Sequence, residues 1–164
     1  MLQGHKVKRV ADVRTVPRSS HNPQFDSANL PGSLEAAGIE YVHIAALGGL
    51  RRARPDSPNG GWRNASFRGY ADYMLTPEFE AGLAELIRLS KKGRTAAMCA
   101  EAVPWRCHRS LIADALLVRG IETADIETAT RLRPHKLTSF ARPEGTCIYY
   151  PPEAVTEGQT ELTL

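Results

Sequence analysis

The sequence predicts an α/β protein, a small three-layer sandwich with a mostly parallel sheet. Short apolar segments alternate along the chain with segments of helical spacing, which is typical of a sheet with helices on its faces. The clearest case is residues 94–120, where an apolar run is followed by a polar loop and a helical segment that ends at Gly120. The right-handed rule for crossover connections then favours helices packed back onto the sheet.

Three segments are predicted to form the main strands. Residues 8–15 contain the apolar residues Val10, Ala11 and Val13, and residues 39–44 alternate apolar with polar side chains. Residues 94–100 form an apolar run bounded by glycine and a polar loop, as expected of a central parallel strand. A further short strand is predicted at 121–126, with ordered pieces at 135–137 and 146–150.

The clearest predicted helix covers residues 76–92. Thr76 is suited to cap it, Pro77 to take its first position, and Gly93 follows its end. A short helix is predicted at 27–37, and another is predicted to have Pro104 in its first turn and to run to Arg119. Residues 47–67 are rich in glycine and arginine and are predicted to form a long loop.

Composition narrows the class of protein. A chain of 164 residues predicts one domain, residues 1–150, followed by a polar tail at 151–164. The formal charge of +3 permits an anionic ligand without requiring nucleic acid. No apolar run is long enough for a transmembrane helix, and the N-terminus lacks an apolar signal core. Three cysteines without an export signal predict reduced thiols in the cytoplasm.

Polar residues gather at the predicted strand ends. Asp12 and Arg14 lie two apart and share one face of their strand, so they either form a pair at the strand end or line a site. Arg18, in the following loop, has a guanidinium suited to a phosphate or carboxylate. Another polar group follows the strand at 94–100, at the kind of position where α/β proteins bind ligands: Cys99, Glu101, Cys107, His108 and Arg109.

Three kinds of chemistry compete for this second group. One is a phosphatase or sulfurtransferase loop, which also follows a strand and opens a helix. A phosphatase loop of that kind needs an arginine six positions after its cysteine, but Arg106 lies one position further from Cys99. Thiols and an imidazole suit a metal, but without a CxxC pair or a clear fourth ligand the sequence predicts no metal site. The third reading uses Glu101 as a general acid or base with a pKa tuned by its neighbours. A thiol near a helix N-terminus, Cys99 or Cys107, is also a candidate nucleophile.

Four separated segments, residues 12–25, 41–49, 67–74 and 98–116, resemble the domain of unknown function 488 (DUF488) family. The resemblance extends over residues 8–137 and is specific, because the motifs recur in the same order. It implies a small α/β domain but no established reaction. By the motif match, the family's signature positions fall on Asp12, Arg14, Pro17, Arg18, Cys99, Glu101, Cys107, His108 and Arg109.

The chain departs from that family at its start. Members usually open with a further strand ending in Gly-His-Ser and a helix, whereas here Gly4 and His5 are followed by Lys6. We therefore expect the N-terminal strand of the family to be missing. An exposed strand neighbour would favour pairing with a second chain, as in a homodimer. The short N-terminus also suggests an alternative function, or the lack of one: the chain could be an inactive, truncated member of the family.

The leading hypothesis is a site that binds or processes a small anionic or nucleotide-like compound. Its predicted catalytic residues are Glu101, Cys107 and His108, and its predicted ligand-binding residues are Asp12, Arg14, Arg18, Cys99 and Arg109. The competing hypothesis is a nucleic-acid-binding module that uses Arg51, Arg52 and Arg54 with the aromatic residues from Trp62 to Tyr73. The sequence identifies no cofactor.

Overall fold

The structure, a computed structural model, describes residues 1–103 and 106–153. Its centre is a three-stranded parallel sheet in the order β2-β1-β3, formed by Glu40–His43, Arg9–Asp12 and Thr95–Met98. Asp12 lies opposite His43 on one side and Met98 on the other, so all three strands end at the same edge. The three predicted strands are confirmed, and each is shorter than predicted. The prediction that residues 94–100 form a central strand is wrong, because β3 lies at the edge of the sheet and β1 lies at its centre.

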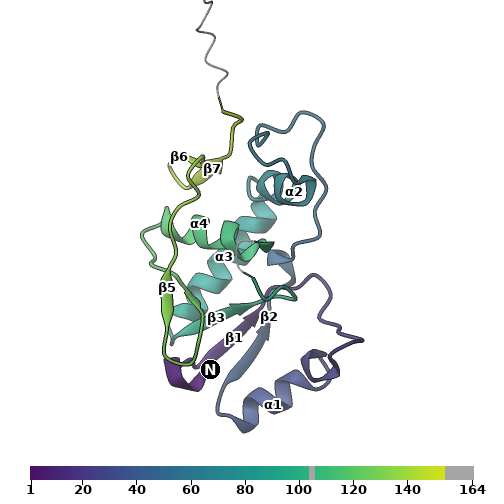
Figure 1. The fold of residues 1–164 in the computed structure, drawn as a ribbon, viewed down its shortest axis with the longest axis vertical. Helices are drawn as coiled ribbons and strands as arrows, with labels where there is room; N and C mark the ends of the chain where they lie inside the picture. The colour runs from purple at the N-terminus through teal and green to yellow at the C-terminus, as the bar shows by residue number, and fades with distance from the viewer. Residues whose placement is uncertain (104–105, 154–164) are drawn as a thin grey trace, which may run out of the picture.

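Helices cover both faces of this sheet (Figure 1). Val10 points toward α1, Leu30–Ala36, and packs in a small cluster with Leu30 and Leu34. Ala11 and Val13 point to the opposite face, into the main core beneath α3, Pro77–Ser90, and α4, Arg109–Leu117. The alternation of side chains along β1 therefore produces the predicted three layers.

The longest helix, α3, begins and ends close to the prediction. The side chain of Thr76 accepts a hydrogen bond from the backbone N–H of Phe79 at 3.3 Å, and Pro77 occupies the first turn. Glu78 and Glu80 in that turn complement the positive end of the helix dipole. The face that contains Leu83 and Leu86 is buried in the main core.

A second helix, α2, spans Ala65–Tyr73 and overlaps the end of the segment that was predicted to be a loop. The side chain of Asn64 caps it by accepting hydrogen bonds from the N–H groups of Ser66 and Phe67. Gly69 lies in the middle of this helix, where a Cβ would come within 2.6 Å of the backbone at residues 51–53. Glycine is needed here because a neighbouring segment packs directly on the helix.

Gly69→Ala is expected to lower the free energy of unfolding by about 1–3 kcal/mol, the usual cost of overpacking. Alanine has the better helix propensity, so the expected loss comes from the clash alone. Gly32→Ala in α1 is the matched control, since a Cβ there meets nothing within 4 Å. Urea denaturation of both variants would measure the difference, and equal stabilities would contradict the close packing of α2.

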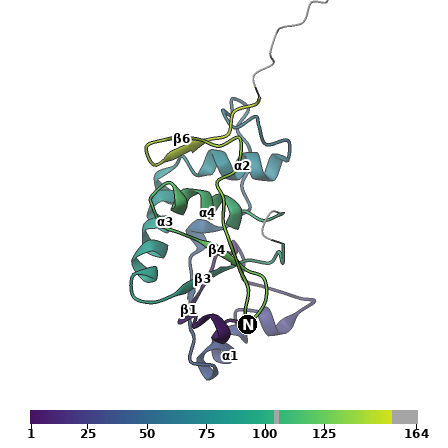
Figure 2. The same ribbon diagram turned by 60° about the vertical axis from the view of Figure 1, so that its left-hand side comes forward.

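The C-terminal part adds two antiparallel hairpins beyond the parallel sheet (Figure 2). β4, Ala124–Ile126, pairs with β5, Leu132–Pro134, and β6, Arg142–Glu144, pairs with β7, Cys147–Tyr149. Three 3₁₀ turns complete the ordered elements, at Gln3–His5, Pro23–Phe25 and Ala45–Leu47. The predicted strand at 121–126 thus exists as β4, but it lies outside the main sheet.

The helix after β3 begins later than predicted. α4 starts at Arg109, and His108 is its cap residue, so Cys107 and His108 precede the helix and are not part of it. Pro104, predicted to lie in the first helical turn, is outside the described residues, as are residues 154–164 of the predicted tail. In the described ranges, no helix has both the length and the apolar character needed to cross a membrane.

Candidate functional site

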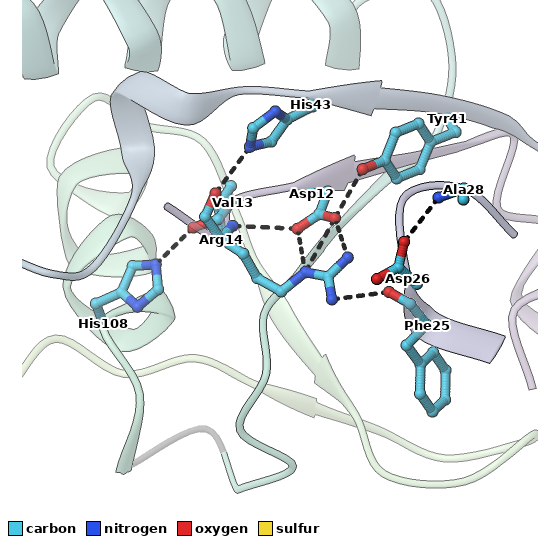
Figure 3. A network of polar contacts seen from close by, with 9 residues as sticks. All are labelled: Asp12, Val13, Arg14, Phe25, Asp26, Ala28, Tyr41, His43 and His108. Carbon is cyan, nitrogen blue, oxygen red and sulfur yellow. Dashed lines mark hydrogen bonds and ion pairs between the residues drawn. The ribbon is translucent and has the colours of Figure 1, made fainter. Parts of the chain in front are cut away.

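The charged pair at the end of β1 is fully buried. Asp12 has no exposed surface, and its Oδ1 accepts hydrogen bonds from the backbone N–H and Nε of Arg14 at 3.1 and 2.9 Å (Figure 3). Its Oδ2 accepts from Nη2 of Arg14 at 2.5 Å and from the Tyr41 hydroxyl at 2.8 Å. The two charges therefore satisfy each other inside the protein.

This pair also organises the loop that follows β1. Nη1 of Arg14 donates to the carbonyl of Phe25 at 2.8 Å, which ties residues 17–25 to the strand end. Burial by itself raises the pKa of Asp12, but hydrogen bonds from Arg14 and Tyr41 outweigh it and hold the pKa below its usual value. Burial and the hydrogen bond to Asp12 raise the pKa of Tyr41 to about 12.

Two histidines donate hydrogen bonds to the backbone carbonyl oxygens just beyond β1. Nε2 of His43 lies 2.8 Å from the carbonyl oxygen of Arg14, and Nε2 of His108 lies 3.0 Å from that of Val13 (Figure 3). A carbonyl can only accept, so each Nε2 carries the hydrogen. The other ring nitrogen of His108, Nδ1, is then left with a lone pair when the ring is neutral.

Two thiols lie beside that nitrogen. Sγ of Cys107 is 3.6 Å from Nδ1 of His108, and these two atoms and Sγ of Cys99 all lie within 4.8 Å of one another. Cys99 comes from the loop after β3, whereas Cys107 comes from the turn before α4. These three side chains, hereafter the sulfur–imidazole cluster, are the group in the described residues that could hold a metal ion.

The surroundings of Cys107 favour its thiolate. A hydrogen bond from the Cys99 thiol makes the largest contribution and, although burial opposes it, the pKa of Cys107 lies well below its usual value. His108 and the backbone N–H of Arg109, 3.5 Å from Sγ, act in the same direction. The same hydrogen bond and burial raise the pKa of Cys99.

Arg109 holds the loop that carries Cys99. Its Nη2 donates to the carbonyl oxygen of Glu101 at 2.6 Å, and the N–H of Glu101 in turn donates to Sγ of Cys99 at 3.2 Å. The carboxylate of Glu101 is exposed. Arg109 therefore positions the loop through its backbone, while the Glu101 side chain remains available to a ligand.

A pocket of about 340 Å³ opens at this edge of the sheet. It is lined by four of the predicted site residues from the second segment, Cys99, Glu101, Cys107 and His108, and by Arg14 from the first. The ends of the two segments, some ninety residues apart in the chain, thus meet beside one hollow. Asp12, Arg18 and Arg109 are not among the lining residues: Asp12 is sealed behind Arg14, and Arg18 is exposed on its loop.

The pocket and an adjoining hollow contain residues that the predicted small-ligand site did not include. Gly49 follows β2, and a Cβ at this position would lie 2.4 Å from Nδ1 of His108, so the absence of a side chain lets the ring approach. Phe67 of α2 lines the pocket and, with Trp62, Glu101 and Arg106, an adjoining hollow. The position of Gly48 and Gly49 after a predicted parallel strand was the available signal, since strand ends meet at one edge.

The residues of the competing nucleic-acid hypothesis mostly contact one another. The guanidinium of Arg51 lies 3.5 Å from the centroid of the Tyr73 ring, and Arg54 forms an ion pair with Asp56. Trp62 packs against aromatic residues of α2 and of the C-terminal part. These aromatic rings anchor the loop to the core.

Comparison with known proteins identifies the family. No curated protein and no solved structure matches the chain significantly. A family model does match, described as "Domain of unknown function DUF488", and it covers residues 1–116, from before the 3₁₀ turn at Gln3–His5 through nearly all of α4. The matched region contains the whole parallel sheet, the sulfur–imidazole cluster and every residue that lines the pocket. The chain belongs to the DUF488 family of domains of unknown function.

Proposed function

We propose that the pocket at the carboxyl ends of β1 and β3 binds and acts on a small anionic, nucleotide-like compound. The observation that carries this proposal is the convergence of Glu101, Arg106, Cys107 and His108 on one hollow. A volume of about 340 Å³ is at the small end of the range for ligand sites. The sulfur–imidazole cluster is the reactive centre, and Glu101 is the group for proton transfer.

The charge distribution supports an anionic ligand. Arg14 lines the pocket, but its charge is compensated by Asp12. Arg106 lines it too, is exposed, and has no carboxylate partner within residues 1–103 and 106–153. The pocket also lies next to the N-terminal end of α4, whose dipole favours negative charge. Phe67 and Trp62 offer aromatic faces next to Arg106, which suits a base or another flat group.

Arg106→Gln is expected to weaken binding of adenosine monophosphate by about tenfold or more, because a hydrogen bond to a charged group contributes about 1.5–3 kcal/mol. Isothermal titration with adenosine monophosphate, adenosine and inorganic phosphate would separate base from phosphate recognition. Arg88→Gln is the matched control, since Arg88 lies exposed on α3 and away from the pocket.

Two results would contradict the proposal: no binding of either phosphate compound to the wild type, or equal affinity in Arg106→Gln. The nucleic-acid alternative has a different signature. A surface that binds a polyanion through Arg51, Arg52 and Arg54 should lose affinity steeply as salt increases, and the loss should be independent of Arg106.

A further inference from the structure

The sulfur–imidazole cluster has the donor atoms of a metal site. Its two sulfurs and one imidazole nitrogen lie within 4.8 Å of one another. We propose that Cys99, Cys107 and His108 bind a zinc ion, with its fourth coordination position directed into the pocket. The role of this ion as the reactive centre rests on the proposed function, but the binding of the ion does not.

The distance between Cys107 and His108 agrees with tetrahedral coordination, and Cys99 lies within 4.8 Å of both. Zinc bonds of about 2.3 Å to sulfur and about 2.0 Å to nitrogen place the donors roughly 3.5–3.8 Å apart. The distance between Sγ of Cys107 and Nδ1 of His108 is 3.6 Å. Two thiolates and an imidazole are borderline-soft donors, a combination that selects zinc over magnesium or calcium.

The hydrogen bonds that surround the cluster are those expected around a metal site. Metal-bound histidines usually donate their other N–H to a carbonyl or carboxylate, which fixes the tautomer and the ring orientation. Here Nε2 of His108 donates to the carbonyl of Val13 at 3.0 Å, which leaves Nδ1 with a lone pair 3.6 Å from Sγ of Cys107. The sulfurs in turn accept N–H groups, Cys99 from Glu101 and Cys107 from Arg109.

Burial distinguishes this cluster from three polar residues that happen to meet on a surface. Cys107 is 2 % exposed, while Cys99 and His108 are half-buried and line the pocket. Three protein ligands and one position open to a cavity are the arrangement of catalytic zinc sites, whereas structural sites are closed by four. An ion here would place its open position near the carboxylate of Glu101 and the guanidinium of Arg106.

A disulfide between Cys99 and Cys107 is the main competing use of two neighbouring thiols. It would explain the proximity of the sulfurs but not the imidazole nitrogen that lies 3.6 Å from Sγ of Cys107. It would also not require the glycine at position 49, whose lack of a side chain gives His108 its place against the backbone. The metal site accounts for all of these features together.

The test uses the full chain, purified under reducing conditions, stripped with a chelator and titrated with zinc and with cobalt(II) as a spectroscopic probe. We expect one ion per chain and a cobalt spectrum with thiolate charge-transfer and tetrahedral d–d bands. Cys99→Ser, Cys107→Ser and His108→Asn should each weaken zinc binding by more than about a hundredfold, beyond the loss typical of second-layer partners. Cys147→Ser is the matched control, because Cys147 is an exposed thiol in β7.

Gly49→Ala supplies a variant that leaves all three ligands in place. A Cβ there would displace the His108 ring, so zinc affinity should fall by about tenfold or more, as for loss of a supporting group. It also keeps the test decisive if a ligand variant fails to fold. Gly32→Ala, in open space on α1, should bind zinc like the wild type.

The proposal is overturned if the reduced wild-type chain binds neither zinc nor cobalt, if it binds cobalt without thiolate bands, or if Cys147→Ser loses as much affinity as Cys107→Ser. Recovery of a Cys99–Cys107 disulfide from a chain that binds no metal would assign the thiols to redox chemistry instead. Arg106→Gln separates this proposal from the proposed function. It should leave the affinity for zinc unchanged but weaken the binding of adenosine monophosphate.

Discussion

Asp12→Ala is expected to lower the free energy of unfolding by about 3–5 kcal/mol, the usual effect of removing one partner from a buried ion pair. The variant leaves the guanidinium of Arg14, whose side chain is 6 % exposed, without its counter-charge. It also removes the acceptor of the Tyr41 hydroxyl. Urea denaturation at neutral pH would measure the loss.

The control comes from a second Asp–Arg pair with the same sequence separation. Arg54 and Asp56 are also two apart and form an ion pair, but their side chains are 55 % and 71 % exposed. Asp56→Ala should cost less than about 1 kcal/mol, as exposed pairs do. Equal losses at positions 12 and 56 would show that the buried pair has no special role in stability.

The contribution of Asp12 should also depend on pH in a defined direction. The pKa of Asp12 is lower in the folded protein than its ordinary value, so the unfolded chain binds the proton more tightly. Stability from this group is therefore complete above the unfolded pKa of about 3.9 and is lost as the pH falls through the folded pKa. The difference between the wild type and Asp12→Ala should be constant from about pH 5 to 7 and narrow below about pH 4.

The strands of the parallel sheet could be predicted because each contains a short apolar segment. Residues 94–100 are apolar almost throughout, although β3 is half-buried at the edge of the sheet and only the central strand, β1, is buried along its whole length. The strands end earlier than predicted because the residues beyond them make contacts that do not belong to the sheet. Arg14 turns back to bind Asp12 and Phe25, and its carbonyl is satisfied by His43.

Helix α2 was missed because its sequence resembles a loop. Gly69 lowers its helix propensity, yet the glycine is there to let residues 51–53 pack on the helix. That contact forms between segments that only the fold brings together, so no local sequence pattern indicates it. Asn64 was the available signal, since asparagine is a strong cap residue and here caps α2 with its side chain.

The meeting of the two polar segments could be predicted from the sequence, but the arrangement of the candidate site could not. Alternating strands and helices predict that the ends of β1 and β3 meet, and they do. The approach of Cys99 to Cys107 and His108 depends on a loop without periodicity, which is held by Arg109 through backbone carbonyls. This is why the sequence showed two separate thiols, whereas the structure shows one cluster with an imidazole.

Asp114→Ala should likewise cost about 3–5 kcal/mol, because it removes a buried carboxylate and leaves its donors unpaired. Asp114 lies within the apolar face of α4, between Ile112 and Ala115, and has no exposed surface. Its carboxylate accepts hydrogen bonds from Nε2 of His135 at 2.7 Å and from the Tyr150 hydroxyl at 2.9 Å. The backbone N–H of Thr138 is a third donor, at 3.1 Å.

These bonds attach the C-terminal part to the rest of the protein. Their donors come from two places beyond α4, one after the β4–β5 hairpin and one after β7. Asp125→Ala is the matched control, because Asp125 pairs with Arg133 across the first hairpin near the surface and should contribute less than about 1 kcal/mol. Trypsin should also cut Asp114→Ala after Arg119, Arg131 and Lys136 more readily than it cuts the wild type.

A double-mutant cycle would show whether Asp114 acts through Tyr150. Tyr150→Phe keeps the buried ring, which packs against Trp62 and Phe140, and removes one hydrogen bond. Alone it should cost about 1–2 kcal/mol, because the carboxylate keeps its other donors. In the Asp114→Ala background the same change should cost much less, since the hydroxyl has already lost its acceptor. Additive losses would mean that the carboxylate holds the C-terminal part through His135 and Thr138 alone.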